Sequence, residues 1–150
     1  METQTEFTTE KEQVDFLKMA LCPKVLVVED DITSEPIWEY ILQRVSEKTL
    51  IMWATSVNEA DHMIRDAVAE GRPFDLVITD IFLSGSLTGI DLWQRFHTQM
   101  PTSIVIMSAI EPMKVQKYFR GLGDPVYLQK PLNMHKTIET VYELLQRPRA

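Results

Sequence analysis

Short apolar runs and one-sided helical stripes alternate along the chain from residue 24 onward. The apolar runs fall within residues 25–28, 49–54, 74–80, 103–107 and 126–128, and successive Val, Ile and Leu residues dominate them. Between the runs, apolar residues recur at the i, i+3, i+4, i+7 spacing that places them on one face of a helix. The alternation predicts five β-α units.

Strands built from continuous apolar residues suit a parallel sheet that helices cover on both faces. Right-handed crossovers between such strands give a doubly wound α/β domain. We therefore predict a doubly wound, five-stranded parallel sheet with a flavodoxin-like strand order, as the middle layer of a three-layer sandwich. The predicted domain spans residues 24–147, and residues 148–150 form a tail.

Local signals mark where several helices begin and end. Ser56 and Glu59 have capping-box spacing, in which each side chain satisfies a free backbone N–H at a helix start. Pro112 is expected to open a helix that runs to about Arg120, and Asn133 is expected to cap the last helix. The predicted core-facing stripes are Trp38, Ile41, Leu42 and Val45; Ala60, Met63, Ile64 and Ala67; Ile90, Trp93 and Phe96; and Ile138, Val141, Tyr142 and Leu145.

Residues 1–23 stand outside this repeating pattern and form an N-terminal extension. Thr9 and Glu12 again have capping-box spacing, and apolar residues between 14 and 21 occupy two roughly opposite helical faces. We expect an extra helix from about residue 10 to 21. Packing against its own domain is one interpretation, a contact with a second copy or a partner is another, and disorder is the third.

Length and composition indicate one soluble domain. The 150 residues are 45% hydrophobic and 25% charged, and no stretch approaches the roughly 20 apolar residues of a membrane span. The acidic, polar N-terminus does not resemble a secretory signal, and the single Cys22 cannot form an internal disulfide. We therefore expect a cytoplasmic protein without membrane contact.

Charge is unevenly distributed along the chain. The formal net charge of −7 argues against a nucleic-acid-binding surface over the whole molecule, so no DNA-binding domain is expected. Residues 112–150, in contrast, carry seven Lys and Arg residues against three acidic ones. The final third is therefore locally basic.

Charged residues follow three of the apolar runs at the point where each run ends. Glu29, Asp30 and Asp31 follow the first run. Asp80 ends the third run, and Lys130 follows the fifth. If these runs are neighbouring parallel strands, their carboxyl ends meet in one crevice. Carboxylate oxygens suit a hard cation such as Mg²⁺ and an ammonium neutralises phosphate, which predicts a site for both.

Four motifs carry a family resemblance: Val28-Glu29-Asp30-Asp31, Ile78-Thr79-Asp80, Met107-Ser108-Ala109 and Gln129-Lys130-Pro131. They occur in this order at the ends of the first, third, fourth and fifth predicted strands. In that register they resemble the receiver domain of two-component response regulators, of which the stand-alone chemotaxis receiver is the simplest relative. The resemblance covers about residues 24–147.

The resemblance implies roles for the acidic residues. Asp80 would be the phosphoryl acceptor. Glu29, Asp30, Asp80 and the backbone carbonyl of Phe82 would form the Mg²⁺ shell. Asp31 is expected to cap the first helix rather than to bind the metal.

The resemblance also implies a switch. Lys130 would neutralise the phosphoryl group, and the hydroxyl of Ser108 would bind one of its oxygens. Tyr127 would then move inward as Ser108 shifts. The alternatives are an ordinary polar strand end for Ser108 and a half-buried core aromatic for Tyr127.

Three features depart from the usual receiver sequence. The loop at 83–89 has no proline and one extra residue, and the turn at 121–125 is longer and stiffer than usual. Phe82 and Ile110 occupy positions that influence how water reaches the acyl phosphate in the family. Two apolar side chains there imply a long-lived phosphoryl group.

Together these features predict a single-domain response regulator that accepts a phosphoryl group on Asp80 from a histidine kinase or phosphotransfer protein. It would signal through phosphorylation-dependent protein contacts at residues 112–147, as a monomer or weak homodimer. It would not be an enzyme beyond its own Mg²⁺-dependent phosphorylation and dephosphorylation. One alternative is an adaptor whose partner binding is independent of phosphorylation. A haloacid-dehalogenase-type phosphatase is disfavoured, because its second Asp is replaced by Phe82.

Overall fold

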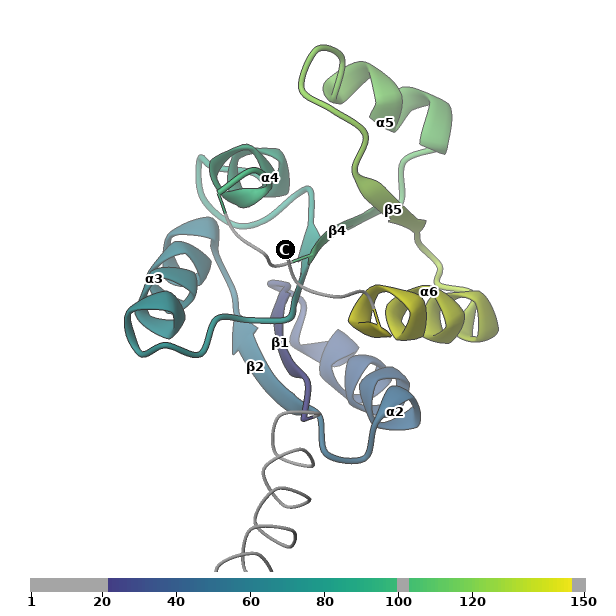
Figure 1. Cartoon of the computed structure of the whole chain (residues 1–150). Helices are drawn as coiled ribbons and strands as arrows, with labels where there is room; N and C mark the ends of the chain where they lie inside the picture. The colour runs from purple at the N-terminus through teal and green to yellow at the C-terminus, as the bar shows by residue number, and fades with distance from the viewer. Residues whose placement is uncertain (1–21, 100–102, 147–150) are drawn as a thin grey trace, which may run out of the picture.

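The sheet has five parallel strands in the order β2-β1-β3-β4-β5 (Figure 1). The computed structural model describes residues 22–99 and 103–146, so the predicted helix at 10–21 lies outside the described residues. The strands are β1 (Lys24–Val28), β2 (Leu50–Ala54), β3 (Leu76–Asp80), β4 (Ser103–Ser108) and β5 (Val126–Gln129). The predicted doubly wound, flavodoxin-like sheet is confirmed.

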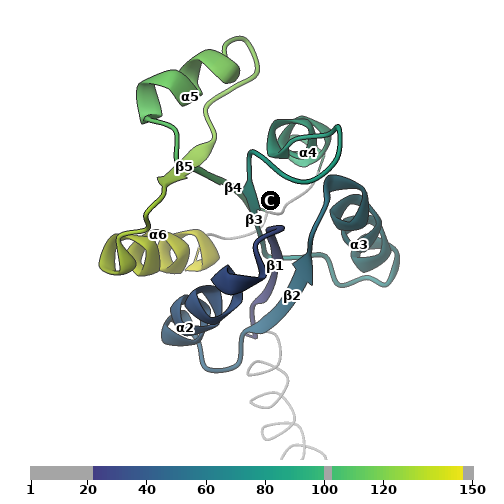
Figure 2. The ribbon, with the colours of Figure 1, turned by 180° about the vertical axis from the view of Figure 1, so that it is seen from behind.

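Helices cover both faces of the sheet. They are α2 (Glu35–Val45), α3 (Val57–Ala69), α4 (Gly89–Phe96), α5 (Pro112–Tyr118) and α6 (Met134–Gln146), and a 3₁₀ turn, η1 (Ile32–Ser34), precedes α2. Figures 1 and 2 show α2 beside α6 on one face, α3 and α4 on the other, and α5 standing beside β5 at the end of the sheet. The three-layer prediction is therefore correct.

Burial follows the position of each strand in the sheet. Every residue of β1 and β3 is buried, whereas the edge strand β2 is partly exposed along most of its length. Two apolar clusters form the core, one beneath α2 and α6 and the other beneath α3, α4 and α5. Because both faces of the sheet are covered, its inner strands are continuous apolar runs.

The start of α3 partly confirms the predicted capping box. The Ser56 hydroxyl accepts from the backbone N–H of Glu59 over 3.2 Å, as predicted. The Glu59 carboxylate, however, accepts from the N–H and hydroxyl of Thr55 at 3.2 and 3.0 Å. In a capping box the Glu59 carboxylate would accept from the backbone N–H of Ser56. It accepts from Thr55 instead, because Thr55 offers two donors.

Two helix details in the last third differ from the prediction. In α6, Tyr142 is 50% exposed, and the buried residues are Thr137, Val141 and Leu144. Ile138 and Leu145 are half-buried and pack against the core, so only Tyr142 departs from the predicted stripe, with the polar end of its ring in water. Helix α5 ends at Tyr118 rather than near Arg120, and the following turn closes with a bond from Leu122 N–H to the Phe119 carbonyl.

The strand register brings the predicted site residues to one edge. Val28 pairs with Thr79, Asp80 with Met107, and Ser108 with Gln129. The residues that follow these positions therefore leave the sheet at the same end. This juxtaposition is the one predicted from parallel neighbouring strands.

Candidate functional site

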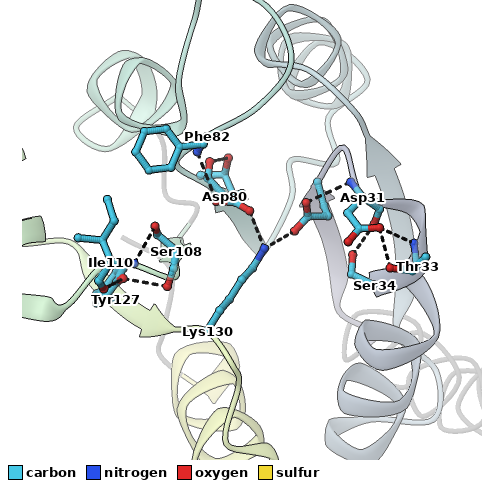
Figure 3. Close-up of polar contacts among 11 residues, drawn as sticks. Asp31, Thr33, Ser34, Asp80, Phe82, Ser108, Ile110, Tyr127 and Lys130 are labelled. Carbon is cyan, nitrogen blue, oxygen red and sulfur yellow. Dashed lines mark hydrogen bonds and ion pairs between the residues drawn. The ribbon is translucent and has the colours of Figure 1, made fainter.

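The Lys130 ammonium joins two carboxylates from different strands (Figure 3). Its Nζ lies 2.5 Å from Asp80 Oδ2, at the end of β3, and 2.8 Å from Glu29 Oε2, after β1. The side chains of Glu29 and Asp80 are 3% and 12% exposed, and that of Lys130 is 31% exposed. The structure thus places one cation against two nearly buried anions.

Burial and ion pairing shift the pKa values of Glu29 and Lys130. Burial raises the pKa of Glu29, and hydrogen bonds from Lys130 and the backbone N–H of Asp31 only partly offset that effect. Partial burial alone would lower the pKa of Lys130, but its hydrogen bonds to Asp80 and Glu29 outweigh burial, and its pKa is raised. Lys130 therefore stays positively charged at neutral pH.

Asp31 caps the 3₁₀ turn η1, whereas the first helix, which it was predicted to cap, begins after Ser34. Its Oδ1 accepts from the backbone N–H of Thr33 at 3.0 Å and from the Thr33 hydroxyl at 2.6 Å. These two hydrogen bonds lower the pKa of Asp31. Figure 3 shows this cap beside Lys130 and Asp80. The Asp31 carboxylate is therefore engaged by Thr33, through both its backbone and its side chain.

The acidic residues fit a Mg²⁺ site with few protein ligands. Across residues 22–99 and 103–146, no three His, Cys, Asp or Glu side chains form a ready-made metal cage. Mg²⁺ does not require one, since it is commonly held by one or two carboxylates and keeps several waters. The Glu29 side chain is only 3% exposed, whereas Asp80 is 12% exposed and Asp30 is exposed. Asp30 is therefore more accessible than Glu29 to a cation that also binds Asp80.

Phe82 follows Asp80 closely and is fixed to it through the backbone. Its N–H donates to Asp80 Oδ1 over 3.3 Å, and its side chain is 55% exposed next to the acceptor (Figure 3). The predicted role of its carbonyl in the metal shell stays a prediction. The backbone bond orients one Asp80 oxygen while Lys130 holds the other.

Ser108 and Tyr127 meet at the end of β4. Ser108 is 2% exposed, and its hydroxyl accepts from the N–H of Ile110 over 3.2 Å. The Tyr127 hydroxyl lies 2.9 Å from the Ser108 carbonyl and is also hydrogen-bonded to the Ile110 carbonyl. Burial raises the pKa of Tyr127, and the nearby Asp80 charge adds to that shift. Tyr127 is thus tied to the segment that leaves β4.

Gly89 is a site residue whose requirement the sequence did not reveal. A Cβ at this position would lie 2.1 Å from the carbonyl oxygen of Asp80, and the Gly89 N–H donates to the Ile81 carbonyl over 2.8 Å. Helix α4 therefore starts in direct contact with the acceptor's backbone. Thr88 and Asp91 form a capping box there, and their spacing was a signal that could have located the helix start.

A family comparison agrees with this fold. The model of the response regulator receiver domain matches residues 25–142, so the chain belongs to the receiver domain family of two-component response regulators. The transcriptional regulatory protein AruR of Pseudomonas aeruginosa is similar, with 26% identity over 133 residues. The match covers 87% of this chain and 52% of AruR, so the chain spans about half the length of that relative.

Solved structures support the fold. A putative response regulator from Chloroflexus aurantiacus has a TM-score of 0.69 at 24% identity, covering 84% of this chain and 99% of that one. The non-phosphorylated HemR receiver domain of Leptospira biflexa has a TM-score of 0.69 at 22% identity, with 85% and 98% covered. The signal receiver domain of a putative LuxO repressor protein from Vibrio parahaemolyticus reaches 0.70 at 23% identity, with 84% and 92% covered.

None of the helices within residues 22–99 and 103–146 has the length and apolar character needed to cross a bilayer.

Proposed function

We propose that this receiver domain accepts a phosphoryl group on Asp80, with Mg²⁺, from a histidine kinase or phosphotransfer protein. The observation that carries the proposal is the Lys130 ammonium held between Asp80 and Glu29 at the carboxyl edge of the sheet. A carboxylate is a nucleophile for phosphoryl transfer once the charge of the incoming group is neutralised. Lys130 supplies one such positive charge.

The proposed transfer is a displacement at phosphorus. One Asp80 carboxylate oxygen forms the new P–O bond while the bond from phosphorus to the donor nitrogen or oxygen breaks, and the donor keeps that electron pair. When bound, Mg²⁺ supplies further neutralisation, and Asp30 and Asp80 would hold it. Lys130 contacts the Asp80 carboxylate before transfer and can contact the phosphoryl oxygens afterwards. Ser108 lies on the neighbouring strand, where its hydroxyl oxygen accepts from the Ile110 N–H and its hydrogen can be donated to a phosphoryl oxygen.

Two apolar side chains would protect the product from water. Phe82 follows the acceptor on the exposed side, and Ile110 is partly buried on the loop after β4. An acyl phosphate is lost by attack of water, so apolar groups at its approach slow that loss. We therefore expect the phosphoryl group on Asp80 to have a long lifetime.

Acetyl phosphate with Mg²⁺ provides the direct test. The wild-type chain is expected to gain the mass of one phosphoryl group, and peptide analysis should map it to the segment that contains Asp80. The gain should disappear when Mg²⁺ is removed with a chelator. Persistent absence of phosphate with both acetyl phosphate and a panel of phosphorylated histidine donors would refute the proposed function.

Removal of the Asp30 carboxylate is expected to weaken Mg²⁺ binding to the unphosphorylated protein. Because few protein ligands hold such a site, loss of one should reduce affinity by about tenfold or more. Isothermal titration calorimetry of Asp30→Ala against the wild type measures the change. Asp31→Asn is the matched control, because asparagine also caps a helical turn and should leave Mg²⁺ affinity nearly unchanged. Equal affinities for Asp30→Ala and wild type would remove Asp30 from the shell.

The output surface in this proposal is built from α5, β5 and α6. A groove of about 910 Å³ is lined by residues of α5, of the turn that follows it and of β5, among them Val115, Phe119 and Tyr127. Lys117 and Arg120 also line it. Tyr127 thus faces both this groove and the carbonyls of the β4 end, and a shift of its ring would change the surface that a partner meets.

Phosphorylation is expected to change hydrogen exchange at residues 108–128. Contacts of Ser108 and Lys130 that exist only with the phosphoryl group bias the two arrangements of Tyr127, since a ligand shifts an equilibrium only through differential interaction. Exchange with and without a beryllofluoride mimic measures this. Changes confined to residues 80–89, with equal partner affinity in both states, would instead favour the phosphorylation-independent adaptor.

The proposal also includes the state of the protein and the extent of its chemistry. The protein would act through protein contacts as a monomer or weak homodimer in the cytoplasm. Its only chemical step would be its own Mg²⁺-dependent phosphorylation and dephosphorylation, so it would not be an enzyme acting on other substrates.

A further inference from the structure

We propose that Ser84 is a positioning residue of the metal site, whose hydroxyl orients the Asp30 carboxylate toward the cation. The inference rests on the proposed function, because it concerns how this chain holds Mg²⁺. It assigns a role to the altered loop between β3 and α4.

The Ser84 hydroxyl connects two segments of the sheet edge that are distant in sequence. Its Oγ donates to Asp30 Oδ2 over 2.9 Å, across 54 positions. Ser84 lies four residues after Asp80 in the loop that leaves β3, and Asp30 follows the end of β1. The hydrogen bond therefore links the loop that carries the acceptor to the acidic residues of the neighbouring strand.

Asp30 differs from Asp80 and Glu29 in its hydrogen-bond donor. In Asp80, one oxygen faces Lys130 and the other the backbone N–H of Phe82. In Glu29, the donors are Lys130 and a backbone N–H. Asp30 instead accepts from the hydroxyl of Ser84, so a single substitution at Ser84 deletes this donor and leaves the donors of Asp80 and Glu29 in place.

A hydrogen bond on one oxygen leaves the carboxylate able to bind a cation. A carboxylate has two oxygens with about four lone-pair positions, so Asp30 Oδ1 stays available when Ser84 occupies one position on Oδ2. Asp30 is an exposed side chain, which loses rotational freedom when a metal binds. The Ser84 bond removes part of that freedom in advance. The serine oxygen also keeps acceptor lone pairs for a water that Mg²⁺ retains.

Titration of the unphosphorylated full chain with Mg²⁺ in a calorimeter tests the role. Outer-shell partners typically contribute about 10–100-fold to metal affinity, and the exposure of this bond reduces the expected loss for Ser84→Ala to about 3–10-fold. Ser84→Thr retains the hydroxyl and should bind within about twofold of the wild type on the same grounds. Ser86→Ala is the matched control, because it removes an exposed hydroxyl from the same loop and should leave affinity unchanged.

A double-mutant cycle separates positioning from a general effect of the loop. In an Asp30→Ala background, Ser84→Ala should have no further effect on Mg²⁺ affinity, because the carboxylate that Ser84 orients is gone. An equal loss in both backgrounds would overturn the role, and so would wild-type affinity in Ser84→Ala alone. If the wild type binds Mg²⁺ and is phosphorylated while Ser84→Ala behaves identically, only the positioning role fails. If the wild type takes neither Mg²⁺ nor phosphate, the proposed function fails with it.

Discussion

Asp80→Asn is expected to abolish phosphorylation of the chain by acetyl phosphate. The amide keeps the shape of the carboxylate, but it lacks the negative charge and the nucleophilic oxygen that attack phosphorus. Lys130 retains Glu29 as a partner, so the fold of the edge should survive the change. Intact mass before and after incubation with Mg²⁺ and acetyl phosphate measures the result, with circular dichroism to verify folding.

Asp31→Asn is the matched control for that experiment. Asp31 lies at the same edge but is engaged with Thr33, and asparagine preserves the cap. This variant should therefore take up phosphate like the wild type. Phosphate that persists in Asp80→Asn, or that maps to another residue in the wild type, would contradict the assignment of Asp80.

Gly89→Ala is expected to destabilise the domain and to reduce phosphorylation. The new methyl group would lie 2.1 Å from the Asp80 carbonyl oxygen and 3.1 Å from the Thr79 hydroxyl oxygen. Relief of that overlap requires a backbone shift, for which overpacking typically costs about 1–3 kcal/mol, and contact with a backbone atom places this case near the upper end. Urea unfolding measures the free energy of unfolding. The extent of phosphorylation by acetyl phosphate shows whether Asp80 has been displaced.

Gly85→Ala separates the effect of a steric clash from the effect of a disfavoured backbone conformation. Gly85 has φ +102, and no atom lies within 4 Å of a Cβ built there. Its substitution should cost about 1 kcal/mol through the disfavoured left-handed conformation. It should also leave Asp80 in place and phosphorylation nearly unchanged. Equal unfolding free energies for Gly89→Ala and the wild type would show that α4 does not need its close approach to the acceptor.

The strands and most helices could be predicted because their signals are local. Successive apolar residues in β1 and β3 are buried on both faces of the sheet. That pattern is typical of a parallel sheet and therefore predicted one. The stripe Ala60, Ile64 and Ala67 in α3 is buried as predicted. The short charged motifs at strand ends located the crevice, since parallel strands place their carboxyl ends together.

Local signals failed where a neighbouring element decided the outcome. In α6 the periodicity allowed more than one apolar face, and packing beside α2 selected the face of Val141 and Leu144 over Tyr142. At the start of α3, Glu59 found two donors on Thr55 that the spacing rule does not consider. Both differences follow from competition between several feasible contacts.

The sequence by itself determined which residues carry charge at the strand ends, and hence the type of chemistry available. Only the tertiary structure decided which of these residues contact one another. Lys130 contacts both Asp80, 50 positions away, and Glu29, 101 positions away. Asp30 is exposed and accepts from the Ser84 hydroxyl, and Gly89 packs on the backbone of the acceptor. The reason is physical. Periodicity and propensity act over a few residues, whereas ion pairs, carboxylate orientation and close backbone approach depend on the register and packing of segments that are distant in the chain.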